Sequence, residues 1–150
     1  MSKFIYRMQN ILNVKYKLED QAKTEFMFAN QVLREEEEKL QMLIDRKKGY
    51  EDAVRNLLKN QLQVDRIKEN QEAIRRMEEY IREQKLRVEE ATRQVERAAE
   101  KLTKLMQERK AQEKLKEKAF EIFLQEENAR ESKEIDELVS FTYGRKQREE

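Results

Sequence analysis

The sequence predicts an all-α fold, a long antiparallel two-helix coiled-coil hairpin with an unpaired C-terminal extension. The 150 residues contain two Gly and no Pro, so few tight turns can form. Ala, Glu, Lys, Arg and Leu make up 56 % of the chain, above the roughly 50 % that is typical of long helices and coiled coils. Apolar residues also recur about every 3.5 residues, which indicates helices that supercoil against a partner.

A first helix is expected over about residues 3–59. Its seam, the stripe that faces a partner helix, has sixteen positions spaced alternately by three and four residues, and twelve of these are apolar. The sixteen are Ile5, Met8, Leu12, Lys15, Glu19, Ala22, Phe26, Ala29, Leu33, Glu36, Leu40, Leu43, Lys47, Tyr50, Val54 and Leu57.

A second helix is expected over about residues 66–140, after a turn at about 60–65. Ten of its twelve seam positions are apolar: Ile67, Asn70, Ile74, Met77, Ile81, Gln84, Val88, Ala91, Val95, Ala98, Leu102 and Leu105. The two series differ in phase by one residue, which indicates an interruption between Leu58 and Arg66. Asp65 is the predicted N-cap, because its carboxylate can accept from the free N–H groups of a starting helix.

Reversal of the chain near residue 62 would pair residues whose numbers sum to about 124. This arrangement sets Leu57 against Ile67, Tyr50 against Ile74, Leu43 against Ile81 and Phe26 against Ala98. Apolar positions then meet apolar positions along both helices. We therefore expect one coiled-coil domain over residues 1–150.

Residues 124–150 have no partner within such a hairpin. They begin with an acidic stretch, continue with an apolar stripe and end with Arg145, Lys146 and Arg148. The stripe consists of Ile135, Leu138, Val139, Phe141 and Tyr143. An apolar stripe without an internal partner indicates an external one, and a frayed C-terminus is the alternative.

Composition argues against an enzyme and against a cofactor or metal site. The chain has no Cys and no His, which removes thiolate chemistry, imidazole catalysis and Cys/His zinc sites. It has no P-loop motif, and consecutive carboxylates such as Glu35 to Glu38 point around a helix and do not converge on one cation. We therefore expect no catalytic, cofactor-binding or metal-binding residues.

Charge and hydropathy also limit the partners. The net charge of +1 gives no reason to expect that the protein binds nucleic acid. No apolar run approaches the ~18 residues of a membrane span, and the first residues lack the apolar core of a secretory signal. A cytosolic protein without membrane insertion is expected. Residues 3–12, which precede the first acid, fit either an amphipathic segment on a membrane surface or packing near Phe120, Ile122 and Phe123.

Three segments of the chain are distinctive: Phe4-Ile-Tyr-Arg-Met-Gln-Asn-Ile-Leu-Asn-Val, Glu37-Glu-Lys-Leu-Gln-Met-Leu-Ile-Asp45 leading to Tyr50, and Lys133-Glu-Ile-Asp-Glu-Leu-Val-Ser-Phe141 with Tyr143. In these segments the sequence resembles the flagellar FliJ family of the bacterial type III export apparatus. The resemblance implies a non-enzymatic coiled coil, without cofactors, located at the inner face of the cell membrane at the flagellar base. The implied partners are the hexameric export ATPase, which the protein stimulates, the export gate protein FlhA, and export chaperones.

The resemblance also implies two contact surfaces. The ATPase contact carries over to Phe4, Ile5, Met8, Leu12, Phe120, Ile122, Phe123, Ile135, Leu138 and Phe141. The gate contact carries over to Lys39, Leu43, Arg46, Tyr50, Ala73, Met77, Tyr80 and Gln84. Packing between the helices is the alternative explanation for Leu43, Tyr50 and Met77, whereas Arg46 and Tyr80 lie off the seam.

Two other functions remain open from the residues. A structural spacer or adaptor that self-associates in parallel would require both halves of the chain to form one continuous helix. A binder of lipid or nucleic acid would act through basic segments such as Arg109 to Lys118, with steep salt dependence.

Overall fold

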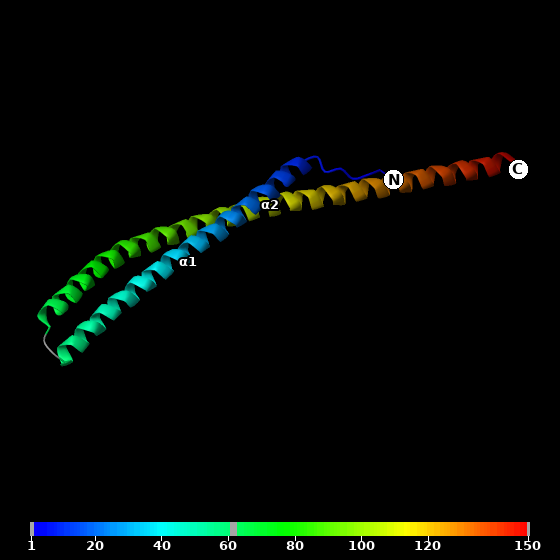
Figure 1. Ribbon diagram of the computed structural model, residues 1–150. Helices are drawn as coiled ribbons and strands as arrows, with labels where there is room; N and C mark the ends of the chain where they lie inside the picture. The colour runs from blue at the N-terminus through cyan, green and yellow to red at the C-terminus, as the bar shows by residue number, and fades with distance from the viewer. Residues whose placement is uncertain (1, 61–62, 150) are drawn as a thin grey trace. The chain divides into compact units, whose positions relative to one another are not determined.

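The computed structural model describes residues 2–60 and 63–149, which form two long helices packed against each other (Figure 1). Helix α1 spans Gln9–Asn60 and helix α2 spans Val64–Glu149, and no strand occurs in these described ranges. The helices run in opposite directions, so the antiparallel hairpin is confirmed. The parallel spacer is contradicted, because its two halves would have to be one helix.

The chain divides into two compact units, each with residues from both helices. The terminal unit comprises Met1–Glu19 and Leu105–Glu150, and the hairpin unit comprises Asp20–Lys104. The single domain expected from the sequence stays a prediction.

The seam of the hairpin unit follows the 3-4 spacing. Ala22, Ala29, Met77, Ile81 and Ala91 are buried between the helices. Two ion pairs across the helices report the register: Lys101 with Glu25 at 2.9 Å and Lys47 with Glu78 at 3.6 Å. The residue numbers of these pairs sum to 126 and 125, close to the expected 124.

Helix α1 begins later than the expected residue 3. Residues 2–6 are not helical, and the Gln9 N–H donates to the Tyr6 carbonyl at 3.1 Å as the helix starts. Ile5 is 80 % exposed and Met8 is 38 % exposed, so these two residues do not belong to the seam. Every other predicted seam position, from Leu12 to Leu57 and from Ile67 to Leu105, is buried or half-buried.

The prediction that Asp65 caps α2 is wrong. The helix begins at Val64, and the Ile67 N–H donates to the Gln63 carbonyl at 3.1 Å, so Gln63 is the residue at the helix boundary. Asp65 lies in the first turn, where its negative charge is favourable next to the unpaired N–H groups. Residues 61–62 of the expected turn lie outside the described residues.

Helix α2 continues to Glu149 and does not end near residue 140. Gly144 has no positive φ and so does not form a left-handed helix cap. Lys146 and Arg148 in the last turn favour the helix end through their charge. The C-terminal extension is therefore an ordered continuation of α2, and the frayed alternative is not supported.

Candidate functional site

An aromatic cluster holds the non-helical N-terminal segment against α2. The Phe4 ring lies 5.1 Å from the Phe120 ring in an edge contact and 5.4 Å from the Phe123 ring, measured between centroids. Tyr6 is buried, and its hydroxyl donates to Gln112 Oε1 at 3.0 Å. Packing on α2 is thus confirmed for this segment, although Ile122 is 55 % exposed and lies outside the cluster.

The structure separates the ten residues of the expected ATPase contact by exposure. Leu12 is 1 % exposed, and Phe4 and Phe123 are half-buried, so packing within the terminal unit accounts for these three. The remaining seven are open to solvent: Ile5, Met8, Phe120, Ile122, Ile135, Leu138 and Phe141.

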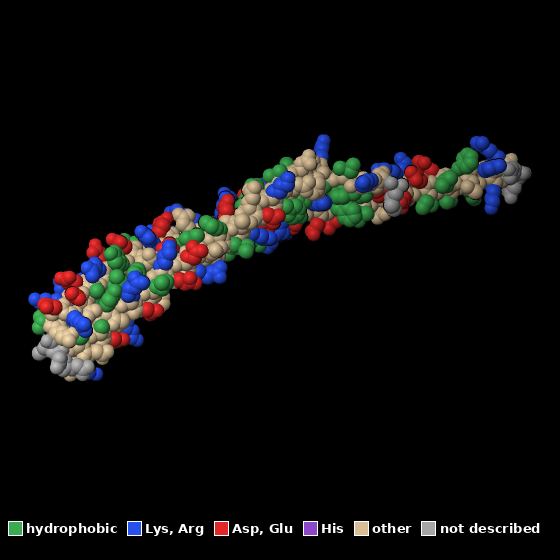
Figure 2. Space-filling model, viewed as in Figure 1, with side chains coloured by type: hydrophobic (Ala, Val, Ile, Leu, Met, Phe, Trp, Pro, Cys, Tyr) green, Lys and Arg blue, Asp and Glu red, His purple; other side chains and the backbone are tan. Residues whose placement is uncertain are grey.

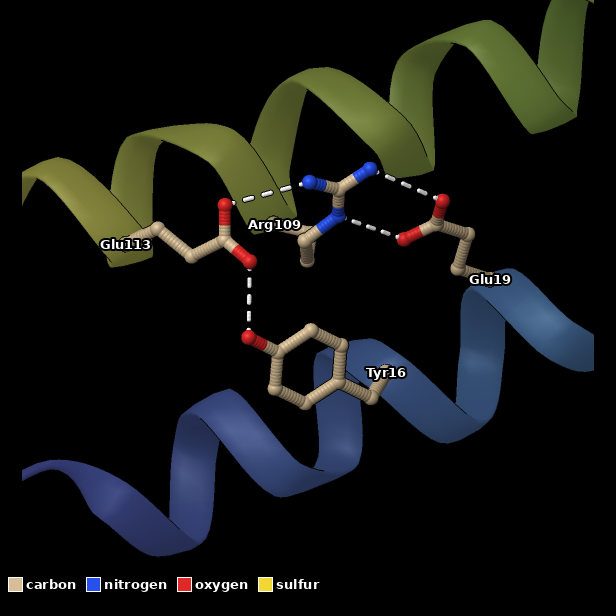
Figure 3. A network of polar contacts seen from close by, with 4 residues as sticks. All are labelled: Tyr16, Glu19, Arg109 and Glu113. Atoms are coloured by element: carbon tan, nitrogen blue, oxygen red, sulfur yellow. Dashed lines mark hydrogen bonds and ion pairs between the residues drawn. The ribbon is translucent and has the colours of Figure 1, made fainter.

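Four polar side chains of the terminal unit form a network of hydrogen bonds and ion pairs (Figure 3). The Arg109 guanidinium donates to both carboxylate oxygens of Glu19, at 2.8 and 3.1 Å, and to Glu113 Oε2 at 3.1 Å. The Tyr16 hydroxyl donates to Glu113 Oε1 at 2.7 Å. The fork of Arg109 matches the Glu19 carboxylate, and such two-point pairs are both strong and specific in geometry.

The network explains how an acid can occupy the seam. Glu19 is 3 % exposed, and a buried carboxylate is tolerated only when it is paired and hydrogen-bonded. The hydrogen bond to Glu19 raises the pKa of the Arg109 guanidinium above its normal range, and the hydrogen bond to Glu113 is the second cause. The hydrogen bond from Tyr16 lowers the pKa of Glu113, and the same bond raises the pKa of Tyr16. The arrangement holds these four side chains in fixed positions relative to one another.

Sequence reasoning placed Glu19 in the seam but missed this network. The signal was available, because a carboxylate at a buried position demands a cation on the facing helix. The expected register set Glu19 opposite Leu105, and Arg109 lies one turn beyond that position.

A second polar contact crosses the seam in the hairpin unit. Gln84 is 6 % exposed, and its amide donates to the Glu36 backbone carbonyl at 2.9 Å and to the Glu36 carboxylate. This hydrogen bond to the carboxylate is the main reason why the pKa of Glu36 is lowered. A polar residue at a single seam position is a known way to specify register.

The residues of the expected gate contact also divide by burial. Ala73, Met77 and Gln84 are at most 7 % exposed, so interhelical packing accounts for them. Leu43 and Tyr50 are half-buried. Lys39, Arg46 and Tyr80 are exposed, and Tyr80 presents 46 % of its surface to solvent. A surface contact at this stripe would rely on these three side chains.

The extension of α2 displays its apolar stripe to solvent. Ile135, Leu138, Val139, Phe141 and Tyr143 are 59 to 71 % exposed. Every residue from 128 to 143 is exposed, and hydrophobic side chains appear on this surface in Figure 2. Exposed apolar side chains that lie this close together make the extension a candidate binding surface.

One exposed apolar pair was not singled out from the sequence. Met27 and Phe28 in the hairpin unit are 69 and 67 % exposed. They border a surface hollow of about 680 Å³ that Gln31, Leu33 and Arg34 also line. The sequence feature that could have identified this pair is its position just off the seam, next to Phe26.

No group of three or more Asp or Glu side chains in residues 2–60 and 63–149 is placed to hold a metal ion. Neither helix, over its described length, has a stretch apolar enough to cross a bilayer.

The fold defines a class: proteins built as a long antiparallel helical hairpin. A family model described as "Flagellar FliJ protein" matches residues 3–148, and the chain therefore belongs to this family. The family is a non-catalytic component of the flagellar type III export apparatus, and the chain is accordingly a component of such an apparatus.

A solved structure supports the fold. The structure of a putative YscO homolog, CT670, from Chlamydia trachomatis matches with a TM-score of 0.77 and 23 % sequence identity, over 99 % of this chain and 100 % of that chain. No curated protein matches the sequence.

Proposed function

We propose that the protein binds the hexameric export ATPase through its terminal unit, stimulates ATP hydrolysis, and links the ATPase to the export gate protein FlhA and to export chaperones. It acts in the cytoplasm, peripheral to the membrane at the flagellar base. The observation that carries the proposal is the exposed apolar stripe of the extension, with Ile135, Leu138 and Phe141 uncovered.

The protein has no reaction of its own in this proposal, so its effect must come from differential binding. A ligand shifts an equilibrium only when it binds one state of its partner more tightly than the other. The extension supplies a single helix that fits the centre of a ring, and one such helix contacts the subunits of a symmetric ring unequally. Unequal contacts would favour one arrangement of the ring.

The gate contact is proposed on a different part of the molecule. Lys39, Arg46 and Tyr80 belong to the hairpin unit and are exposed. An exposed Tyr combines apolar area with a polar tip and is common among residues that dominate binding. Separate surfaces would let one chain contact the ATPase and FlhA at the same time.

The test measures the hydrolysis rate of the purified export ATPase while this protein is titrated in. We expect saturable stimulation near about one chain per six ATPase subunits. A Leu138→Ser/Phe141→Ser variant should lose most of the stimulation, because it removes two large exposed apolar side chains of the extension.

The matched control is Met27→Ser/Phe28→Ser. These side chains have nearly the same exposure, at 69 and 67 %, but belong to the hairpin unit. The control should stimulate as the natural protein does. Equal loss in both variants, or no stimulation by the folded natural protein, would contradict the proposal.

A further inference from the structure

The terminal unit carries two blocks of opposite charge, and beyond the second of them lie Arg145, Lys146 and Arg148 near the end of α2. The paired block consists of residues 2–18 and 105–125, and its first part has four cations and no acid. The acidic block consists of residues 126–137, with six acids and two bases, for a net charge of −4. The net charge of +1 for the whole chain conceals this separation.

The acidic side chains of the extension differ from those of the seam in whether they have a hydrogen-bond or ion-pair partner. Glu19 and Glu36, which occupy seam positions, each have a hydrogen-bond partner on the facing helix. Glu131, Glu134, Asp136 and Glu137 are exposed, and within the described residues no cation lies within ion-pair distance of them. The extension therefore has unused negative charge beside its uncovered apolar stripe.

The two features share one short stretch of helix. Ile135 and Leu138 lie at i and i+3, while Glu131 and Glu134 lie one turn before them. A surface that covers the apolar side chains must come close to the carboxylates, and a partner without positive charge would bury them unpaired at considerable cost.

We infer that residues 131–141 of the extension dock against a surface of the ATPase ring that is lined by Lys or Arg next to apolar residues. The inference rests on the proposed function and names the chemistry of its contact.

Charge reversal in the full-length chain tests the inference. Glu131→Lys/Glu134→Lys should weaken binding to the purified export ATPase at least tenfold at about 50 mM NaCl, and the loss should shrink at about 500 mM because salt screens exposed charges. Binding is measured by fluorescence anisotropy of labelled protein. Helicity measured by circular dichroism should be unchanged.

The matched control is Glu79→Lys/Glu83→Lys. It makes the same change in net charge, also at two exposed acids of α2, but in the hairpin unit. It should alter affinity less than twofold. The opposite variant, Lys133→Glu, adds an acid to the block and should tighten binding.

The outcomes separate this inference from the function on which it rests. Absence of binding by the natural protein would overturn the proposed function. Binding that is unaffected by reversal, or affected equally in the control, would leave that function standing and overturn the inferred basic lining. If the extension instead mediates pairing of two copies, light scattering will report a dimer that the reversal alters, which also overturns it.

Discussion

Helix α2 contains two regions of similar apolar content and opposite environment. In the hairpin unit, Met77, Ile81 and Ala91 are at most 9 % exposed because α1 covers them. In the extension, Ile135, Leu138 and Phe141 are at least 59 % exposed. The difference teaches that apolar spacing alone does not distinguish a seam from a binding surface, because the distinction depends on whether a facing helix covers the apolar side chains.

The largest expected effect comes from the same substitution in each environment. Leu12→Ala should cost about 2–5 kcal/mol in the free energy of unfolding, because a fully buried side chain leaves a cavity. Leu138→Ala should change it by less than about 0.5 kcal/mol, since the side chain is exposed and Ala is a good helix former. Urea denaturation measures both, and similar costs would remove the distinction.

The next effect concerns the buried acid. Glu19→Gln removes the charge that pairs with Arg109 and should lower the melting temperature clearly more than Glu131→Gln in the extension. Thermal circular dichroism measures both variants. A double-mutant cycle with Arg109→Gln should show coupling between positions 19 and 109. Independent effects would mean that the pair does not act together.

A smaller effect is expected at an exposed side chain of the paired helices. Tyr80→Ala should weaken binding to the cytoplasmic domain of the export gate by roughly fivefold, which is typical for loss of an exposed aromatic contact. Helicity should not change, because Tyr80 is 46 % exposed. Isothermal titration calorimetry measures the affinity, and an unchanged value would remove Tyr80 from the proposed gate contact.

The smallest expected effect is the pH dependence of stability. The pKa values of Glu36 and Glu113 are lowered in the folded protein. Their ionised forms therefore contribute stability above the unfolded pKa of about 4.3, and this contribution is lost as the pH falls through the folded values. Urea midpoints between about pH 6 and pH 3 should fall less in a Glu36→Gln/Glu113→Gln variant than in the natural protein.

The 3-4 spacing predicted most of the fold, because burial of a seam depends directly on that periodicity. The prediction that Ile5 and Met8 belong to the seam was wrong because a tertiary contact overrode the helical pattern. Phe4 contacts Phe120 and Phe123 from a non-helical segment. The predicted end of α2 near residue 140 was also wrong, because the helix continues through Gly144, which adopts no positive φ. The error at Ile5 and Met8 depends on contacts distant in sequence, whereas the error at the end of α2 does not.

The candidate surfaces were predictable only in part. Exposure of Ile135, Leu138 and Phe141 followed from the length left over beyond the hairpin. Exposure within the paired helices could not be derived in the same way, because a residue beside the seam is covered or uncovered according to the side chains opposite it. Met27 and Phe28 illustrate this point, as does the burial of Ala73.

The polar contacts of the seam restrict how the two helices can move. A slide of one heptad would keep apolar positions facing apolar positions, but it would bring Glu19 to Leu102 or Lys116 in place of Arg109. The same slide would bring Glu36 to Met77 or Ala91 in place of Gln84. In either direction the slide would leave the Glu36 carboxylate facing an apolar side chain, and in one direction it would also leave Glu19 unpaired, so these contacts oppose shear between the helices.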